Sequence, residues 1–237
     1  MDKKNQITEG VIWKQLLIFF FPIMVGTLFQ QLYNTVDAII VGRFVGKQAL
    51  ASVGGSAAVL TNFVIGFFTG LSAGATVIIS QFYGAKNLKQ LSKGLHTAYA
   101  FSITVSILIS VIGWFSTPAL LHLLKTPSDV IPDSILYLRI YFLGMLFTLT
   151  YNMGSSIMRA IGDSRRPLIY LVICCVINII LDILFVIVFH MGIAGAAIAT
   201  VISQGVSAIL VTRSLMKSYG ILKLELRACL LYTSPSP

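Results

Sequence analysis

The sequence predicts an all-α integral membrane protein, a bundle of six transmembrane helices, and three observations carry this prediction. Hydrophobic residues make up 57% of the 237-residue chain, charged residues only 11%, and the mean hydropathy is +0.89. A soluble domain of this size cannot bury so much apolar side chain. The hydrophobic residues also come in blocks of about 20 or more, the length of a helix that crosses about 30 Å of hydrocarbon. Runs such as LVICCVINIILDILFVIVF do not alternate between apolar and polar residues, which excludes the strands of a transmembrane barrel.

The predicted bundle occupies residues 13–216, and its connections are short, polar and rich in Gly or Pro, which is typical of helical hairpins. The six expected spans, in order, are 13–41, 52–82, 93–117, 133–158, 167–189 and 195–216.

The two ends of the chain differ from the bundle. Residues 1–12 are expected to be a cytoplasmic N-terminus, and the span behind them is too long for a signal peptide and lacks a cleavage site. Residues 217–237 are interpreted as a truncated cytoplasmic tail, and the Ser/Pro-rich stretch 229–237 is expected to be non-native.

The distribution of Lys and Arg predicts the orientation, because cytoplasmic loops retain positive charge. Thirteen of the 17 basic residues fall on one side, and four fall on the other, namely Arg43, Lys47, Lys125 and Arg139. Both termini are therefore expected in the cytoplasm. The net charge of +9 lies in short loops beside membrane helices, which favours topology over nucleic-acid binding as its explanation.

Two acidic residues, Asp37 and Asp182, lie within predicted spans, whereas the other six lie at termini or in loops. A carboxylate near the middle of a span costs on the order of 3 kcal/mol on insertion scales unless it is protonated, paired or hydrated. Such residues are functional candidates by default, so both aspartates are predicted to act in the mechanism.

Polar residues recur at helical spacing on four of the spans. On the fifth span, Asn178 and Asp182 stand four residues apart, so the amide is expected to donate to the carboxylate. The other stripes are Thr27, Gln30, Asn34 and Asp37 with Tyr33 beside them, then Thr148, Asn152, Ser155 and Arg159, and finally Thr200, Gln204 and Ser207. These lines are expected to face one another around a hydrated cavity.

Proline and glycine predict local features of two spans. Pro22 removes a backbone hydrogen bond inside the first span and is expected to bend it or act as a hinge. Gly66, Gly70 and Gly74 repeat every four residues on the second span and are interpreted as packing contacts between helices. The three cysteines and three histidines have no spacing that suits a metal site.

Three motifs in order resemble a known family. The stretch QQLYNTVDAIIVGRFVG at 30–46, the turn MRAIGDSRRP at 158–167 and NIILD at 178–182 resemble the first half of multidrug and toxic-compound extrusion (MATE) exporters of the DinF-like branch. The resemblance covers about residues 10 to 225. It implies one six-helix lobe of a twelve-helix protein, and the second lobe is missing.

The resemblance also implies roles for residues. Asp37, Asp182, Asn178, Asn152 and Thr200 would bind the coupling proton or Na⁺, with Na⁺ held at Asp37, Asn178 and Asp182, and Pro22 would be the hinge. Gln30, Tyr33, Asn34 and Gln204 would line the cavity. The expected function is export of drugs or organic cations by a cation-coupled antiporter in the bacterial or archaeal cell membrane, without a cofactor, a resident metal or nucleic acid.

Two alternatives remain. One is a flippase of the same superfamily for lipid-linked oligosaccharides or polysaccharides, whose cavity would be richer in cationic residues. The other is a membrane-embedded enzyme such as a prenyl transferase, which would need clustered carboxylates for magnesium and pyrophosphate. Two isolated aspartates do not supply that cluster, so the chain is expected not to be an enzyme.

Overall fold

The structure is a computed structural model that describes residues 12–217, and within this range the chain is helical without any strand. The helices are α1 (Ile12–Ile40), η1 (Val41–Val45), α2 (Lys47–Gly54), α3 (Ser56–Gly84), α4 (Leu88–Leu123), α5 (Ile131–Leu143), α6 (Met145–Ala160), α7 (Arg165–Asp182), η2 (Ile183–Val188) and α8 (Gly192–Met216). Residues 1–11 of the expected cytoplasmic N-terminus and residues 218–237 of the expected tail lie outside the described residues.

Five segments of the described chain are long and apolar enough to cross a membrane. A sixth span results when α5 and α6, which meet at a 49° bend, are taken together. The bend falls at Gly144, which caps α5 and precedes α6. The described residues therefore form the expected bundle of six transmembrane helices.

The helices extend beyond the expected ranges mainly at their polar ends. The second span begins at Lys47 as the short helix α2 and turns at Gly55 before α3 continues to Gly84. The third span starts at Leu88, where the Asn87 side chain accepts a hydrogen bond from the backbone N–H of Gln90 at 3.3 Å. Capping by an Asn side chain satisfies one free N–H group at the start of a helix, which hydropathy alone does not reveal.

The first and fifth spans each end in a π-helical segment. At the end of η1, the backbone N–H of Gly46 donates a hydrogen bond to the carbonyl of Val41 at 3.1 Å. At the end of η2, the backbone N–H of Phe189 donates to the carbonyl of Leu184 at 2.9 Å. These bonds join residues five apart instead of four, and such segments occur frequently at functional sites. The two segments also contact each other at the same end of the bundle.

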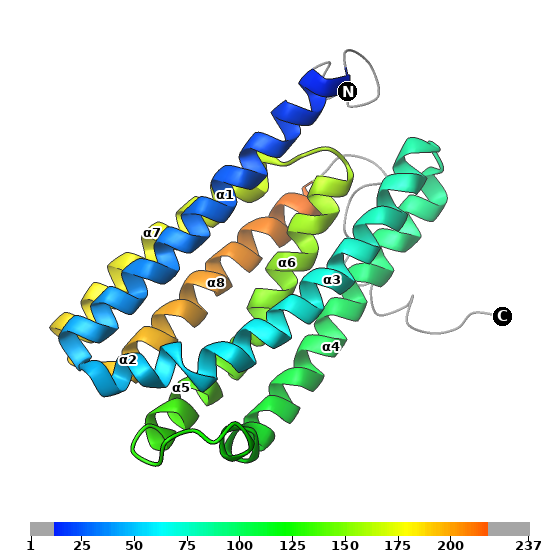
Figure 1. The fold of residues 1–237 in the computed structure, drawn as a ribbon. Helices are drawn as coiled ribbons and strands as arrows, with labels where there is room; N and C mark the ends of the chain where they lie inside the picture. Colours follow the sequence, from blue (N-terminus) through cyan, green and yellow to red (C-terminus); the bar gives the residue numbers. More distant parts are fainter. Residues whose placement is uncertain (1–11, 218–237) are drawn as a thin grey trace.

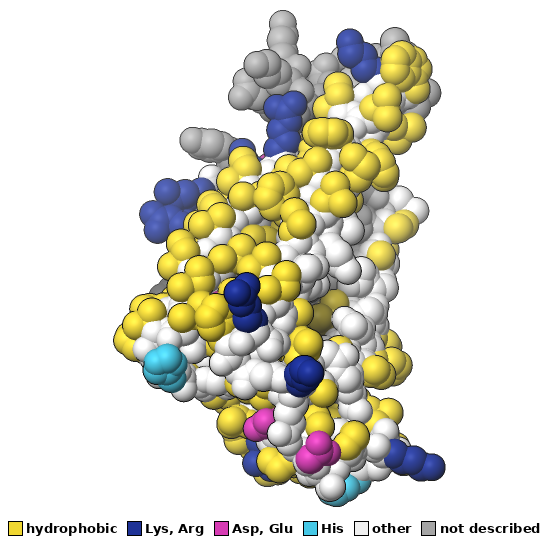
Figure 2. All heavy atoms as spheres, turned by 60° about the vertical axis from the view of Figure 1, so that its left-hand side comes forward, with side chains coloured by type: hydrophobic (Ala, Val, Ile, Leu, Met, Phe, Trp, Pro, Cys, Tyr) yellow, Lys and Arg dark blue, Asp and Glu magenta, His cyan; other side chains and the backbone are white. Residues whose placement is uncertain are grey.

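The helices pack as two outer pairs with two helices between them (Figure 1). Helix α1 packs along α7, and α3 packs along α4. Helices α6 and α8 lie between these two pairs, and α6 contacts α3. The buried hydrophobic core forms two clusters, one of which includes Tyr99 and Ile157 and the other Phe68 and Phe142. The outer surface is rich in hydrophobic side chains over most of the length of the helices, as Figure 2 shows for one face.

The glycines that bring helices together are not the ones that the sequence pattern suggested. A Cβ atom added at Gly66, Gly70 or Gly74 would meet nothing within 4 Å, so these residues do not pack against another described helix. A Cβ at Gly113 would lie 2.4 Å from the Phe142 ring, and one at Gly144 would lie 2.4 Å from Val201. Spacing along one helix shows where small residues gather but not which helix approaches them.

Candidate functional site

A polar cavity of about 420 Å³ lies between α1 and α3, with α6 and α8 behind it. Its polar lining comes from α1, α3, α5, α6 and α8, namely Gln30, Gln31, Tyr33, Asn34, Asp37, Thr61, Asn62, Tyr137, Tyr141, Thr148, Tyr151, Asn152 and Gln204. Asp37 is the only charged side chain among the described residues that line it. The cavity can therefore accept a positively charged group without a competing cation.

Most of the stripe expected on the first span lines the cavity, namely Gln30, Tyr33, Asn34 and Asp37, whereas Thr27 does not. Gln30 and Asn34 are exposed in this lobe, whereas Asp37 is 7% exposed. The carboxyl group thus lies at the inner end of a line of neutral polar groups. On the opposite wall, Asn152 and Gln204 supply further amides.

Three of the expected coupling residues do not line the cavity. Asn178, Asp182 and Thr200 lie on α7 and α8 and are 0%, 0% and 3% exposed. They lie in the core of the lobe. Asp37 and Asp182 lie on α1 and α7, which pack along each other, and each precedes one of the two π-helical segments that contact each other.

The hydrogen bond expected from Asn178 to Asp182 is not formed. The Asn178 amide donates instead to the hydroxyl of Thr200 at 3.5 Å, and that hydroxyl donates to the carbonyl of Ala196 at 3.1 Å. The side chain of Asn178 therefore turns toward α8 and connects two helices. Residues four apart share a helix face, but a neighbouring helix offers the competing acceptor.

Several buried oxygen atoms of this site have no hydrogen-bond partner among the described residues. They are Oδ1 of Asp37, both carboxyl oxygens of Asp182, Oδ1 of Asn178 and Oε1 of Gln204. Buried polar atoms are nearly always satisfied, so these oxygens call for a partner such as a proton, a cation or water. Carboxylate and amide oxygens are also hard ligands that suit a Na⁺ ion.

Tyrosine side chains surround the acidic group, and the sequence reasoning missed two of them. Tyr33 on α1 and Tyr137 and Tyr141 on α5 lie near one another and near Asp37. The rings of Tyr137 and Tyr141 are stacked, with centroids 6.0 Å apart. Their spacing of four residues on a predicted span was the available signal, and Asn62 on α3 is a second polar residue that went unnoticed.

Each buried acid lies just before a π-helical segment. Asp37 precedes η1 by one turn, and Asp182 is the residue immediately before η2. Pro22 is buried and lies within α1, which continues through it from Ile12 to Ile40. Within residues 12–217, no three His, Cys, Asp or Glu side chains group as a metal site would require.

The bundle and its polar cavity define one lobe of a multi-pass membrane transporter, and comparisons with known proteins give the family. The MatE family model matches residues 22–184, and the chain belongs to this family of multidrug efflux transporters.

Two relatives from Bacillus subtilis (strain 168) are the probable multidrug resistance proteins YpnP and YoeA. YpnP is 37% identical in a match that covers 86% of this chain and 46% of YpnP. YoeA is 35% identical in a match that covers 81% of this chain and 42% of YoeA. A solved MOP superfamily transporter from Pyrococcus furiosus superposes with a TM-score of 0.88 at 25% identity, over 100% of this chain and 51% of that one. The chain thus spans about half the length of the proteins it matches.

Proposed function

We propose that this chain forms the N-terminal lobe of an antiporter that exports drugs or organic cations in exchange for protons or Na⁺. The observation that carries the proposal is the pair of carboxyl groups, one at the cavity wall and one buried behind it, whose oxygens lack partners. A group that binds and releases a cation in a low-dielectric interior is what coupling requires.

The energy available from one coupling ion is sufficient. A proton moving inward yields about 2.3 kcal/mol per 100 mV of membrane potential and about 1.4 kcal/mol per pH unit. Each 1.4 kcal/mol supports a tenfold gradient of the exported compound. One site is therefore enough for useful export.

The cavity lining supports an organic cation as the substrate. An organic cation is attracted by the faces of aromatic rings, and Tyr33, Tyr137, Tyr141 and Tyr151 all line the cavity beside Asp37. The relatives YpnP and YoeA are also described as probable multidrug resistance proteins. A flippase for lipid-linked saccharides is less well supported, because no Lys or Arg is among the described lining residues to bind a pyrophosphate.

Transport requires a second lobe in this proposal. Alternating access works by motion of one repeat against another around a shared site, and this chain supplies one repeat of six spans. Pro22 would serve as the hinge of α1, so Pro22→Ala should slow turnover more mildly than loss of an acid. The positive-inside distribution places the loops of Lys89 and Arg165 in the cytoplasm and those of Lys125 and Gly192 outside.

The deciding experiment uses a full-length transporter that contains this chain. Asp37→Asn and Asp182→Asn keep the size of each side chain but remove its ability to exchange a proton or hold a cation by charge. We expect each variant to insert and fold normally and to lose export of a fluorescent cation from proteoliposomes under a pH or Na⁺ gradient. Export at the parental rate, with parental ion dependence, would show that both acids are structural.

A further inference from the structure

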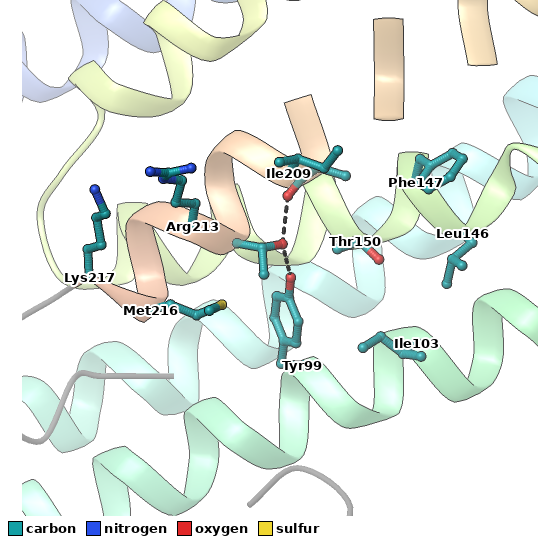
Figure 3. Close-up of a pocket in the computed structure, with 11 residues that line it drawn as sticks. Tyr99, Ile103, Leu146, Phe147, Thr150, Ile209, Arg213, Met216 and Lys217 are labelled. Atoms are coloured by element: carbon teal, nitrogen blue, oxygen red, sulfur yellow. Dashed lines mark hydrogen bonds between the residues drawn. The ribbon is translucent and has the colours of Figure 1, made fainter. Parts of the chain in front are cut away.

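A second hollow of about 680 Å³ lies between α4, α6 and α8 (Figure 3). Most of its wall is apolar, including Ile103, Phe147 and Ile209. Arg213 and Lys217 lie together at one end of it, both exposed, and neither forms an ion pair with any described residue. We call this hollow the α4/α6/α8 groove.

The groove lies on the opposite side of its helices from the transport cavity. On α6, Thr150 lines the groove while Thr148 and Asn152 line the cavity, and two residues correspond to about 200° of helical rotation. On α8, the groove residues Ile209 and Arg213 lie about 140° and 180° around the helix from the cavity residue Gln204, whereas Ala208 lies about one turn beyond Gln204. A second lobe that closed the cavity would therefore leave the groove facing lipid.

The length of the groove fits one leaflet of a bilayer. On α8 its residues run from Ala208 to Lys217, a rise of about 14 Å at 1.5 Å per residue. Half of the hydrocarbon core is about 15 Å thick. The two cations fall in the last turn and at the end of the helix, where a lipid headgroup would lie, and the apolar wall extends from there toward the middle of the membrane.

We infer that the groove is a binding site for an anionic phospholipid. The phosphate would lie between Arg213 and Lys217, and an acyl chain would lie along Ile103, Phe147 and Ile209. A neutral lipid would cover the same apolar wall but would leave Arg213 and Lys217 without a counter-charge. Basic pockets between membrane helices on the cytoplasmic side select anionic headgroups by this complementarity.

The floor of the groove is fixed by a contact between two of its helices. The Tyr99 hydroxyl on α4 hydrogen-bonds to the Thr212 hydroxyl on α8, as the dashed line in Figure 3 shows. Tyr99 is 1% exposed, so the pair closes the space beneath the lipid and does not compete for the headgroup. The contact therefore holds α4 and α8 together beneath the groove.

The test is native mass spectrometry of the purified 237-residue chain in detergent, titrated with phosphatidylglycerol or with phosphatidylcholine of identical acyl chains. We expect the first phosphatidylglycerol to bind more tightly than the first phosphatidylcholine. Arg213→Gln with Lys217→Gln should weaken phosphatidylglycerol binding about 25-fold, since each cation near an anionic lipid contributes on the order of fivefold. The matched control, Arg43→Gln with Lys47→Gln, removes two exposed cations from the other end of the bundle and should change binding less than about twofold.

A second pair of variants tests the apolar wall without touching charge. Ile209→Trp fills the groove and should weaken both lipids, whereas Ile202→Trp, two turns away on the same face of α8, should not. Equal affinity for the two lipids, or an unchanged preference in the Arg213/Lys217 variant, would overturn the inference. A gain of tenfold or more in lipid affinity on removal of residues 218–237 would also overturn the inference, because that segment would then be the occupant of the groove.

Discussion

The side-chain amide of Asn178 on α7 donates to the Thr200 hydroxyl on α8 at 3.5 Å, in a part of the lobe that is closed to the cavity. This contact joins the helix that carries Asp182 to the central helix of the bundle. The carbonyl oxygen of the same Asn178 side chain is buried and has no hydrogen-bond partner among the described residues. The amide nitrogen thus links two helices, whereas the amide oxygen remains able to accept a hydrogen bond.

Removing the Thr200 hydroxyl should therefore destabilise the lobe. Thr200→Val leaves the buried amide of Asn178 without its acceptor, and we expect a loss of about 1–2 kcal/mol in the free energy of unfolding. A double-mutant cycle with Asn178→Leu should give a coupling energy of about 0.6 kcal/mol, measured by unfolding in mixed micelles. The control is Thr69→Val, whose hydroxyl also bonds to a backbone carbonyl but is exposed. An equal loss in the free energy of unfolding for Thr200→Val and Thr69→Val would contradict a specific contact between Thr200 and Asn178.

Gly144 should not tolerate even one added methyl group. A Cβ there would lie 2.4 Å from Val201 on α8, and the branched valine cannot move easily, so Gly144→Ala should cost about 1–3 kcal/mol. Gly70→Ala meets nothing within 4 Å and should be neutral or stabilising by up to about 1 kcal/mol. The melting temperature in detergent measures both, and adding Val201→Ala should restore the stability of Gly144→Ala. Failure of that rescue would mean that another contact sets the cost.

The orientation of the lobe can be measured directly. In a variant without native cysteines, Lys89→Cys should react with a membrane-impermeant maleimide only after the cells are opened, whereas Lys125→Cys should react on intact cells. The reason is the excess of basic residues in the loops on the side of Lys89. Strong labelling of Lys89→Cys on intact cells would reverse the assignment.

Tyr141 should contribute to binding through its ring. If the stacked Tyr137 and Tyr141 attract an organic cation, Tyr141→Ala should weaken binding of tetraphenylphosphonium to the purified chain by about tenfold, equivalent to 1.4 kcal/mol. Tyr141→Phe keeps the aromatic face and should stay within about twofold of the parent. Equilibrium dialysis measures both. Equal losses in the two variants would assign the effect to the hydroxyl group instead.

The sequence predicted the helical bundle and the MATE family well, because hydropathy and motifs depend on single segments. Asp37 and Asp182 stood out because a carboxyl group within a span is conspicuous against apolar neighbours. Both are buried in the structure, and their role in coupling stays a prediction. The sequence did not predict that Asn178 turns to Thr200, nor that Gly144 and not Gly70 lies against another helix. Those features depend on which two helices pack together. The periodicity of a single sequence shows which residues share a face of one helix, but not which other helix contacts that face.

The π-helical segments after Asp37 and Asp182 have a consequence for how the lobe could be altered. A π-helical bond encloses one residue more than an α-helical bond, so each of these spans carries the equivalent of a one-residue insertion beside its acid. Deleting a single residue from Val41–Val45 would restore the α-helical register. It would then rotate Asp37 by about 100° relative to α2 and shift it by about 1.5 Å. A deletion that leaves every polar side chain in place would thus redirect the carboxyl group away from its present position at the cavity wall.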